Sequence, residues 1–147
     1  TTEIYPLSLL VALPICRAKA PNSSFFTNWP GLDDRITWDI EVATTGRYSV
    51  DVYYACPADR TGSTVELSCG DNRLLGRVAE AHDPPLRGTE HDRYPREGES
   101  LVKDFKPMKL GEIQLNRGRG SLSLRAIEIP KHEVMEVRGL VLTLLEP

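Results

Sequence analysis

Residues 80–105 gather the side chains of this sequence that are best suited to chemistry. Two of its three histidines lie here, and each precedes an aspartate, as His82-Asp83 and His91-Asp92. An imidazole beside a carboxylate can move protons or, with a third ligand, hold a metal ion. However, residues adjacent in sequence need not meet in space, and no third metal ligand follows at a recognisable spacing. Metal binding and acid–base catalysis are therefore the weaker explanations of this stretch.

The same stretch meets the simpler requirements of sugar binding. Arginine offers a planar fork of donors to a sulfate or carboxylate, and an aromatic ring stacks on the apolar face of a sugar. The candidate carbohydrate contacts in this stretch are His82, Arg87, His91, Arg93 and Tyr94. For each of them the alternative is an ion-pair network that only orders the loop. Because three prolines stiffen the stretch, we expect it to be ordered.

A second group of candidates lies in "SSFFTNWPG", before the first clear strand. Aromatic rings in a segment rich in Gly, Pro and Asn cannot all belong to a strand core, and Trp29 precedes the turn-forming Pro30-Gly31. We therefore expect the ring of Trp29 to be exposed and, with Phe26, available to a ligand. The alternative is a tryptophan that plugs one end of the fold. Trp38, in contrast, is in phase with the apolar residues of a strand and is expected in the core.

Alternating sequences predict strands on both sides of these candidates. Residues 36–42 and 48–54 alternate between apolar and polar side chains, with a Thr-Gly pair at 45–46 between them. A short turn with glycine between two alternating segments predicts an antiparallel hairpin. We predict a second hairpin around the Gly-Asp-Asn turn at 70–72 and a third around the turn "NRGRG".

The remaining segments complete the predicted fold. The apolar phase shifts after Ala126, which predicts a bend or bulge. "VRGLVLTLL" is almost continuously apolar, as in a central strand covered on both faces, whereas Pro6 places a strand in "IYPLSLLVAL" at a sheet edge. No window has a helical stripe. The sequence therefore predicts an all-β fold, an antiparallel, jelly-roll-like β-sandwich. We expect one domain, 1–147, with a long loop insert at 80–105.

Composition excludes several classes of function. The net charge of −3 argues against nucleic-acid binding, and no segment is long and apolar enough to span a membrane. Cys16, Cys56 and Cys69 match no zinc spacing and allow one disulfide at most, so buried apolar cysteines are the expectation. Nucleophile-elbow and phosphate-loop motifs are absent. We therefore predict no catalytic residue, no cofactor, and neither a nucleic-acid nor a membrane partner.

Several segments resemble known carbohydrate-binding modules. "ITWDIEVATTGRYSVDVYYA" is similar to the early hairpin of family 6 and family 35 modules, and "SLSLRAIEI" and "VMEVRGLVLTLL" look like their last two strands. A more specific resemblance is to the C-terminal accessory domain of secreted bacterial sulfatases of the planctomycete type. The segments that carry it are, in order, "PNSSFFTNW", "DDRITWDIEVATTGRY", "EAHDPPLRG", "VKDF" and "VMEVRGLVLTLLEP".

The resemblance implies a secreted, non-catalytic module that holds a polysaccharide, sulfated or otherwise anionic, beside a catalytic domain of the same polypeptide. The family 6 pattern implies that Phe26 and Trp29 lie in the binding cleft, and it adds Lys131 and His132 from "IPKHEVM". The acidic residue that supplies a structural calcium ligand in that pattern has no counterpart here, so a calcium ion is not predicted. Two other functions are weighed: a structural domain that packs on a catalytic domain without binding glycan, and a small metal-dependent enzyme.

Overall fold

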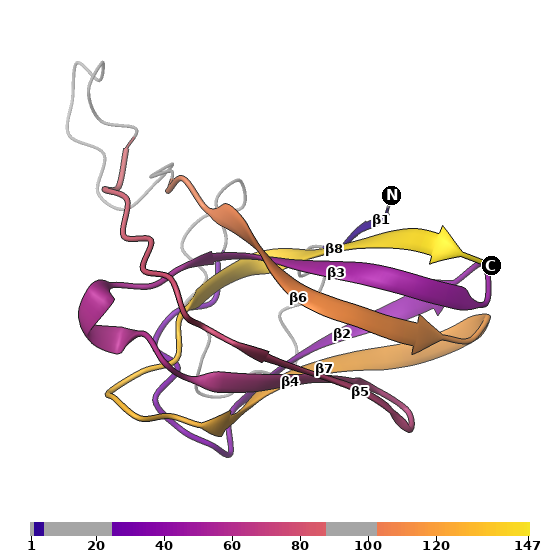
Figure 1. The fold of residues 1–147 in the computed structure, drawn as a ribbon, viewed down its shortest axis with the longest axis horizontal. Helices are drawn as coiled ribbons and strands as arrows, with labels where there is room; N and C mark the ends of the chain where they lie inside the picture. Colours follow the sequence, from indigo (N-terminus) through magenta and orange to yellow (C-terminus); the bar gives the residue numbers. More distant parts are fainter. Residues whose placement is uncertain (1, 5–24, 88–102) are drawn as a thin grey trace.

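The computed structural model describes residues 2–4, 25–87 and 103–147, and these form two antiparallel β-sheets packed face to face (Figure 1). Sheet A has the strand order β1-β8-β3-β6, and sheet B has the order β2-β7-β4-β5. Apart from the short 3-10 helix η1 (Ala58–Arg60), the regular structure of these residues is all strand. The predicted all-β antiparallel sandwich is confirmed. None of the described residues belongs to a helix that could cross a membrane.

The two sheets place most of the loops at one end of the molecule. Sheet A contains β1 (Thr2–Ile4), β3 (Gly46–Ala55), β6 (Lys106–Leu115) and β8 (Glu136–Glu146). Sheet B contains β2 (Arg35–Val42), β4 (Thr64–Cys69), β5 (Asn72–Arg77) and β7 (Gly118–Glu128). Figure 1 shows η1, the segment before β2, the β7–β8 loop and the start of the insert at the same end, and the short β2–β3 and β6–β7 links at the other.

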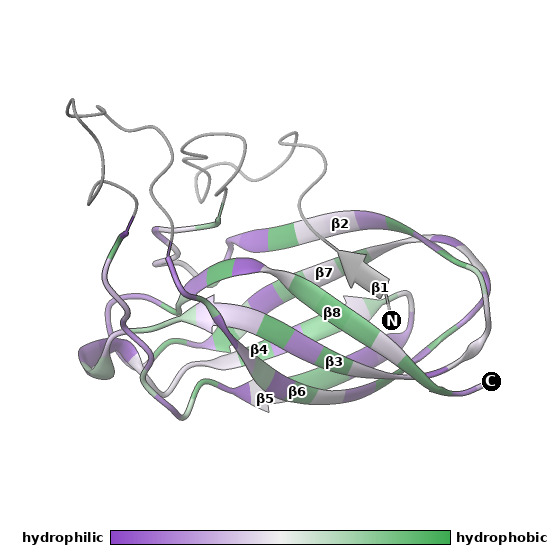
Figure 2. Cartoon of the chain, turned by 90° about the horizontal axis from the view of Figure 1, so that it is seen from above, coloured by the Kyte–Doolittle hydropathy of each residue, from purple (hydrophilic) through white to green (hydrophobic). Residues whose placement is uncertain are grey.

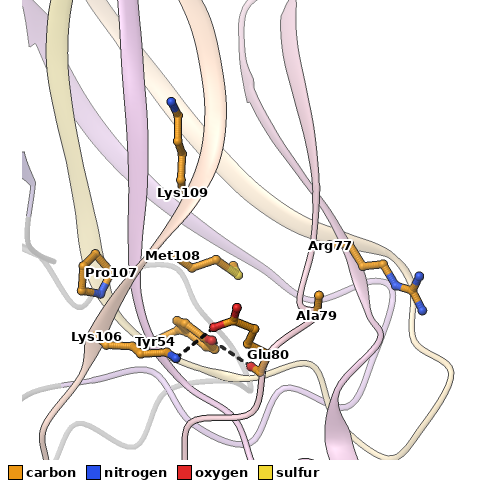
Figure 3. A pocket seen from close by; sticks show the side chains of 8 residues that line it. All are labelled: Tyr54, Arg77, Ala79, Glu80, Lys106, Pro107, Met108 and Lys109. Atoms are coloured by element: carbon orange, nitrogen blue, oxygen red, sulfur yellow. Dashed lines mark hydrogen bonds and ion pairs between the residues drawn. The ribbon is translucent and has the colours of Figure 1, made fainter.

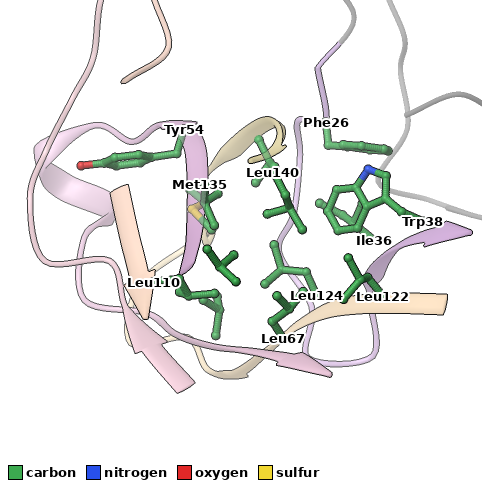
Figure 4. Packing of buried hydrophobic residues seen from close by; sticks show 14 of the residues in the cluster. Phe26, Ile36, Trp38, Tyr54, Leu67, Leu110, Leu122, Leu124, Met135 and Leu140 are labelled. Atoms are coloured by element: carbon green, nitrogen blue, oxygen red, sulfur yellow. The ribbon is translucent and has the colours of Figure 1, made fainter. Parts of the chain in front are cut away.

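The core is built from the inward-facing residues of both sheets. Along β2, Ile36, Trp38 and Val42 are buried while the residues beside them face solvent. Figure 2 shows hydrophobic and hydrophilic residues alternating along β3 as well. Trp38 is 3% exposed and meets Phe26 edge-on, with ring centroids 6.2 Å apart. Figure 4 shows this pair at one side of the aliphatic cluster. The predicted core position of Trp38 is confirmed.

One of the three predicted hairpins is confirmed and two are wrong. β4 and β5 pair through a turn in which Gly70 has a φ of 58°. The consecutive strands β2 and β3 belong to different sheets, and so do β6 and β7. Their short links therefore cross from one layer to the other. The prediction failed because a period of two identifies the buried face of a strand but not its hydrogen-bonding partner, and both layers of a sandwich offer such a face.

The predicted irregularity after Ala126 is confirmed. Val65 of β4 pairs with Ala126, and Thr64 pairs with Glu128, so Ile127 is the extra residue of a bulge in β7. The bulge turns this apolar side chain outward, where it is 41% exposed.

The first and last strands of the chain, β1 and β8, match their predictions in part. β8 lies between β1 and β3, as expected of a central strand, and β1 lies at the edge. However, Leu144 and Leu145 are 37% and 43% exposed, so the prediction of cover on both faces is wrong at this end of β8. The described pairing with β1 reaches only Leu142, which leaves the last residues of β8 without that neighbour. Most of the segment predicted as the first strand, including Pro6, lies outside the described residues.

Candidate functional site

A pocket of about 350 Å³ opens where β5 ends and β6 begins (Figure 3). β5 is an edge of sheet B and β6 is an edge of sheet A, so the pocket lies at the seam between the two layers. Aromatic, aliphatic and charged side chains meet in it. The residues that line it are Tyr54, Arg77, Ala79, Glu80, Lys106, Pro107, Met108 and Lys109.

The seam is closed beside the pocket by close contact between β5 and β6. Gly76 faces the side chain of Leu110, and Gly111 faces that of Leu74, so the absence of side chains on both glycines permits the approach. The register of β6 against β3 shifts at Leu110, which is the extra residue of a bulge. This bulge keeps Leu110 in the core, at 7% exposure, while Lys109 remains exposed at the rim of the pocket.

Tyr54, Glu80 and Lys106 form a linked group at the base of the pocket. The Tyr54 hydroxyl donates a hydrogen bond of 2.8 Å to the backbone carbonyl of Glu80, and Lys106 Nζ lies 3.2 Å from Glu80 Oε2. The same Nζ lies 6.0 Å from the centre of the Tyr54 ring, within the range of a cation–π contact. Burial raises the pKa of the Tyr54 hydroxyl, although the charge of Lys106 acts in the opposite direction. The hydroxyl is therefore a neutral donor at physiological pH.

Positive charge predominates around the pocket. Arg77, Lys106 and Lys109 carry three positive charges against the single carboxylate of Glu80, which leaves a local excess of two. Figure 3 shows Lys106 beside Glu80 over Tyr54, while Lys109 and Arg77 extend outward from the rim. A concave site with this balance attracts an anionic group, because walls of low dielectric concentrate the field of the cations.

The two described ends of the insert are joined to each other and to the sandwich. The backbone of His82 pairs with that of Cys56 through hydrogen bonds of 2.7 and 2.8 Å. The His82 ring, through Nε2, contacts the carbonyl oxygen of Asp104, and Arg87 forms an ion pair with the Asp104 carboxylate. The predicted order of the whole of 80–105 stays a prediction, because residues 88–102 lie outside the described residues.

The C-terminal end of the insert is also held in place by side-chain contacts. Lys103 pairs with Glu136 at the start of β8, and both side chains are largely buried, at 12% and 17% exposure. The ring of Phe105 packs on Phe25 with centroids 5.2 Å apart. These contacts fix the direction in which the chain enters β6 and therefore the position of Lys106.

The expectation of an exposed ring at Trp29 is wrong. Trp29 is 1% exposed and Phe26 is 7% exposed, so both plug the loop end of the sandwich, which was the alternative for Trp29. The Trp29 carbonyl accepts a 3.0 Å hydrogen bond from the Val134 backbone, and Phe26 pairs with Val137. These bonds tie the segment to the chain entering β8 and direct its rings inward. Among the described Phe, Trp and Tyr side chains, Phe25, Tyr53 and Phe105 are partly exposed and the others are buried, so none of them is a fully exposed platform.

Four of the other predicted contacts belong to the described residues, and all four lie at the loop end of the sandwich. His82 and Arg87 belong to the base of the insert, and Lys131 and His132 are exposed in the β7–β8 loop. His91, Arg93 and Tyr94 lie outside the described residues. Within the described ranges, no three His, Cys, Asp or Glu side chains gather closely enough to hold a metal ion.

Sequence reasoning missed the residues of the pocket itself. Tyr54 was recognised only as part of an alternating strand, and Lys106 and Lys109 were not singled out. Tyr54 and Lys106 are direct partners across the β3–β6 pair, although they lie far apart in the sequence. No local pattern could have brought them together. The short run "VKDFKPMK", which leads into β6 and contains three lysines, was the available signal.

Cys56 lies under this end of the sandwich and is not a reactive thiol. Burial raises its pKa to about 11, and Asp59 and Asp83 act in the same direction, against Arg60 and Lys131. A thiol with this pKa is protonated at neutral pH and is a poor nucleophile. Cys56 and Cys69 are both free; Cys56 is buried, as expected, whereas Cys69 is only partly buried.

The fold is that of family 35 carbohydrate-binding modules. CBM35 from Cellvibrio japonicus Abf62 matches with a TM-score of 0.58 and 12% identity, over 87% of this chain and 85% of that chain. Xyl-CBM35, solved in complex with a disaccharide that contains glucuronic acid, matches with a TM-score of 0.58 and 13% identity, over 92% of this chain and 93% of that chain.

A further match is a whole enzyme. The GH26-CBM35 β-(1,4)-mannanase of Podospora anserina matches with a TM-score of 0.53 and 14% identity, over 100% of this chain and 26% of the enzyme. This chain also spans only 20% of a ruminal GH26 endo-β-1,4-mannanase that it matches. At such identities the likeness establishes the fold. No protein-family model matches the sequence, and no curated protein matches it either.

Proposed function

We propose that this chain is a non-catalytic carbohydrate-binding module that binds an anionic polysaccharide through the pocket at the β5–β6 seam. The observation that carries the proposal is the excess of Arg77, Lys106 and Lys109 over Glu80 in a concave site at the loop end. A volume of about 350 Å³ lies in the range of small-ligand sites, and it suits a sugar unit rather than a large cofactor.

Each wall of the pocket has a role in this binding. Lys106 is positioned by Glu80 and by the Tyr54 ring, so its ammonium group is held ready to meet a carboxylate or sulfate. Charge-assisted hydrogen bonds from Lys106 supply affinity for that group, and the positive charges of Lys109 and Arg77 at the rim add attraction to it. The apolar surfaces of Met108 and Pro107 offer contact to the less polar face of a sugar ring.

The module acts by keeping an attached catalytic domain at its polymer. Linking a binding module to an enzyme raises the effective concentration of substrate, so weak affinity is sufficient. The resemblance to the accessory domain of secreted sulfatases supports a sulfated polymer and an extracellular setting. The structures that share the fold are carbohydrate-binding modules, one of them in complex with a glucuronic acid containing disaccharide, which supports an acidic sugar as ligand.

Binding of glucuronic acid, glucose 6-sulfate and glucose, measured by calorimetry, tests the proposal. We expect the two acidic sugars to bind and glucose to bind more weakly. Lys106→Gln should weaken binding of the acidic sugars roughly tenfold, the loss expected for one charge-assisted hydrogen bond. Arg117→Gln, in the β6–β7 link at the opposite end, is the control and should change nothing.

Two results would count against the proposal. Equal affinity for glucose and for the acidic sugars would refute recognition of the anionic group. Absence of binding to sugars and to sulfated and neutral polymers alike would favour the alternative, a structural domain that packs on a catalytic domain.

A further inference from the structure

The outer face of sheet B carries a cluster of arginines, one of which, Arg77, also lines the pocket. In β4, Val65 and Leu67 point into the core, so Glu66 between them points outward. The strand register places Arg125 of β7 beside Glu66, and it places Arg35 of β2 beside Arg125. Arg73 and Arg77 of β5 lie on the same face. The arginine cluster is Arg35, Arg73, Arg77 and Arg125.

Glu66 holds two members of the arginine cluster in fixed positions. Its Oε1 lies 3.1 Å from Arg73 Nη1 and 3.1 Å from Arg125 Nε. The Glu66 side chain is 11% exposed, whereas those of Arg73 and Arg125 are 56% and 49% exposed. Each guanidinium has five N–H donors and uses few of them in its contact with Glu66, so most remain directed to solvent. One carboxylate thus orients two guanidinium groups without neutralising both.

The other two members of the cluster have no ion-pair partner among the described residues. Arg35 is the direct cross-strand neighbour of Arg125, and two like charges in this position repel each other. The carboxylate nearest to Arg35 in sequence, that of Asp34, accepts a 3.2 Å hydrogen bond from the backbone of Gly31. The Arg77 guanidinium extends toward Gly62, since its Nη2 lies 3.9 Å from the position of a β-carbon there.

The balance of charge on this half of the face is positive. The four arginines face two carboxylates, Glu66 and Glu128, the latter placed on the same face by its pairing with Thr64. The net local charge is therefore +2. The other acids of the face, Asp39 and Glu41, lie further along β2 and alternate with the inward-facing residues.

A row of small hydroxyl side chains lies next to the arginines. The register aligns Thr37, Ser123 and Ser68 across three neighbouring strands, and Arg73 of β5 completes the row. Leu75, 56% exposed, lies beside Glu66 in the adjacent row. A flat surface of hydroxyl groups, guanidinium groups and one apolar side chain can contact the hydroxyls, the anionic groups and the apolar face of a sugar chain.

We propose that the arginine cluster is a second binding surface, occupied by a further stretch of the anionic polysaccharide whose sugar unit enters the pocket. This inference rests on the proposed function. Arg77 connects the two sites, because it lines the pocket and belongs to the arginine cluster. Nucleic acid fits less well, because the outward-facing residues of β2, β4, β5 and β7 include no Phe, Trp or Tyr ring to stack on bases, and the net charge of the chain is −3.

Binding of dextran sulfate, neutral dextran and glucuronic acid separates the two sites. The test variant is Arg35→Gln/Arg73→Gln, and the matched control is Arg47→Gln on sheet A. Arg47 is 50% exposed, like Arg73, but pairs with two carboxylates, those of Glu112 and Glu146. We expect the test variant to bind dextran sulfate at least about fivefold more weakly, with a smaller dependence on salt. The affinity of the test variant for glucuronic acid should not change. Arg47→Gln should change neither the affinity for dextran sulfate nor the affinity for glucuronic acid.

The outcomes distinguish this inference from the proposed function. If Lys106→Gln weakens binding of both anionic probes while Arg35→Gln/Arg73→Gln binds dextran sulfate like the wild type, the second surface is refuted and the pocket stands. If the wild type binds none of the probes, both fail. If a short DNA duplex displaces dextran sulfate as effectively as dextran sulfate itself, the face is a general polyanion surface and its assignment to a glycan is wrong. Thermal unfolding of each variant verifies that it is folded.

Discussion

A β-carbon on Gly76 would lie 2.1 Å from Cδ1 of Leu110, far inside van der Waals contact. Gly76 belongs to the edge of sheet B and Leu110 to the edge of sheet A, so this contact joins the two layers next to the pocket. Leu110 is itself buried and cannot simply swing into solvent. The width of the seam, and with it the shape of the pocket, therefore depends on the missing side chain at residue 76.

Gly76→Ala should lower the free energy of unfolding by roughly 1–3 kcal/mol, as expected for overpacking of a core. It should also weaken binding of acidic sugars, because the seam must widen. Gly120→Ala is the matched control: its β-carbon would meet only Cys69 Sγ, at an ordinary 3.5 Å. Urea denaturation of both variants tests the prediction, and equal stabilities would contradict it.

Trp29→Ala should destabilise the fold, because the ring is a buried plug at the loop end. The loss of a buried tryptophan side chain costs about 3–5 kcal/mol. Trp29→Phe, which retains most of the apolar volume, should recover a large part of the loss. A Trp29→Ala variant that kept wild-type stability in chemical denaturation would show that the ring is not part of the core.

Glu66→Gln should lower the free energy of unfolding by about 1 kcal/mol or more, because it leaves Arg73 and Arg125 close together without their shared carboxylate. Both arginines are about half exposed, so solvent limits the effect. Glu112→Gln is the comparison: Glu112 is 41% exposed and pairs with Arg47 at 3.2 Å, and its loss should cost less than about 0.5 kcal/mol. The test is to measure both losses in free energy of unfolding at low salt. A larger loss for Glu112→Gln than for Glu66→Gln would contradict the prediction.

The strands were predictable from sequence because burial on one face imposes a period of two. Trp38 was placed correctly because its immediate neighbours share that period. Trp29 was not, because its burial depends on the backbone of Val134, which is distant in sequence. The assignment of β2 and β3 to a hairpin failed for the same reason. Local spacing gives the inward face of a strand but not the sheet that it joins.

The site was less predictable than the fold. The Tyr54–Lys106 contact needs the β3–β6 pairing, and the two arginines that share Glu66 come from β5 and β7, on opposite sides of β4. Such contacts follow from strand order, which no alternation pattern contains. The insert is recognisable by its composition, and its first residue, Glu80, does line the pocket, where it pairs with Lys106 of β6.

Stability should fall at alkaline pH partly through Cys56. The folded state holds the thiol proton with a pKa of about 11, above the ordinary value of 9.0, because the thiol is buried. As the pH rises from 9 to 11, the unfolded chain loses this proton and the folded chain keeps it, so the free energy of unfolding decreases. Cys56→Ala lacks this proton. The difference in free energy of unfolding between the wild type and Cys56→Ala should therefore become smaller over the same pH range. A difference that stays constant would contradict the prediction.

The links that cross between the layers have a consequence for the rate of folding. Among the described strands, β4 and β5 are the only consecutive pair that are also hydrogen-bonded neighbours. Every other described pairing joins strands with at least one strand between them in the sequence, so long loops must close before those pairings contribute stability. A topology dominated by non-local pairings folds slowly, over roughly milliseconds to seconds. The β4–β5 hairpin is the part that can form first, and the sheets assemble around it only when distant segments meet.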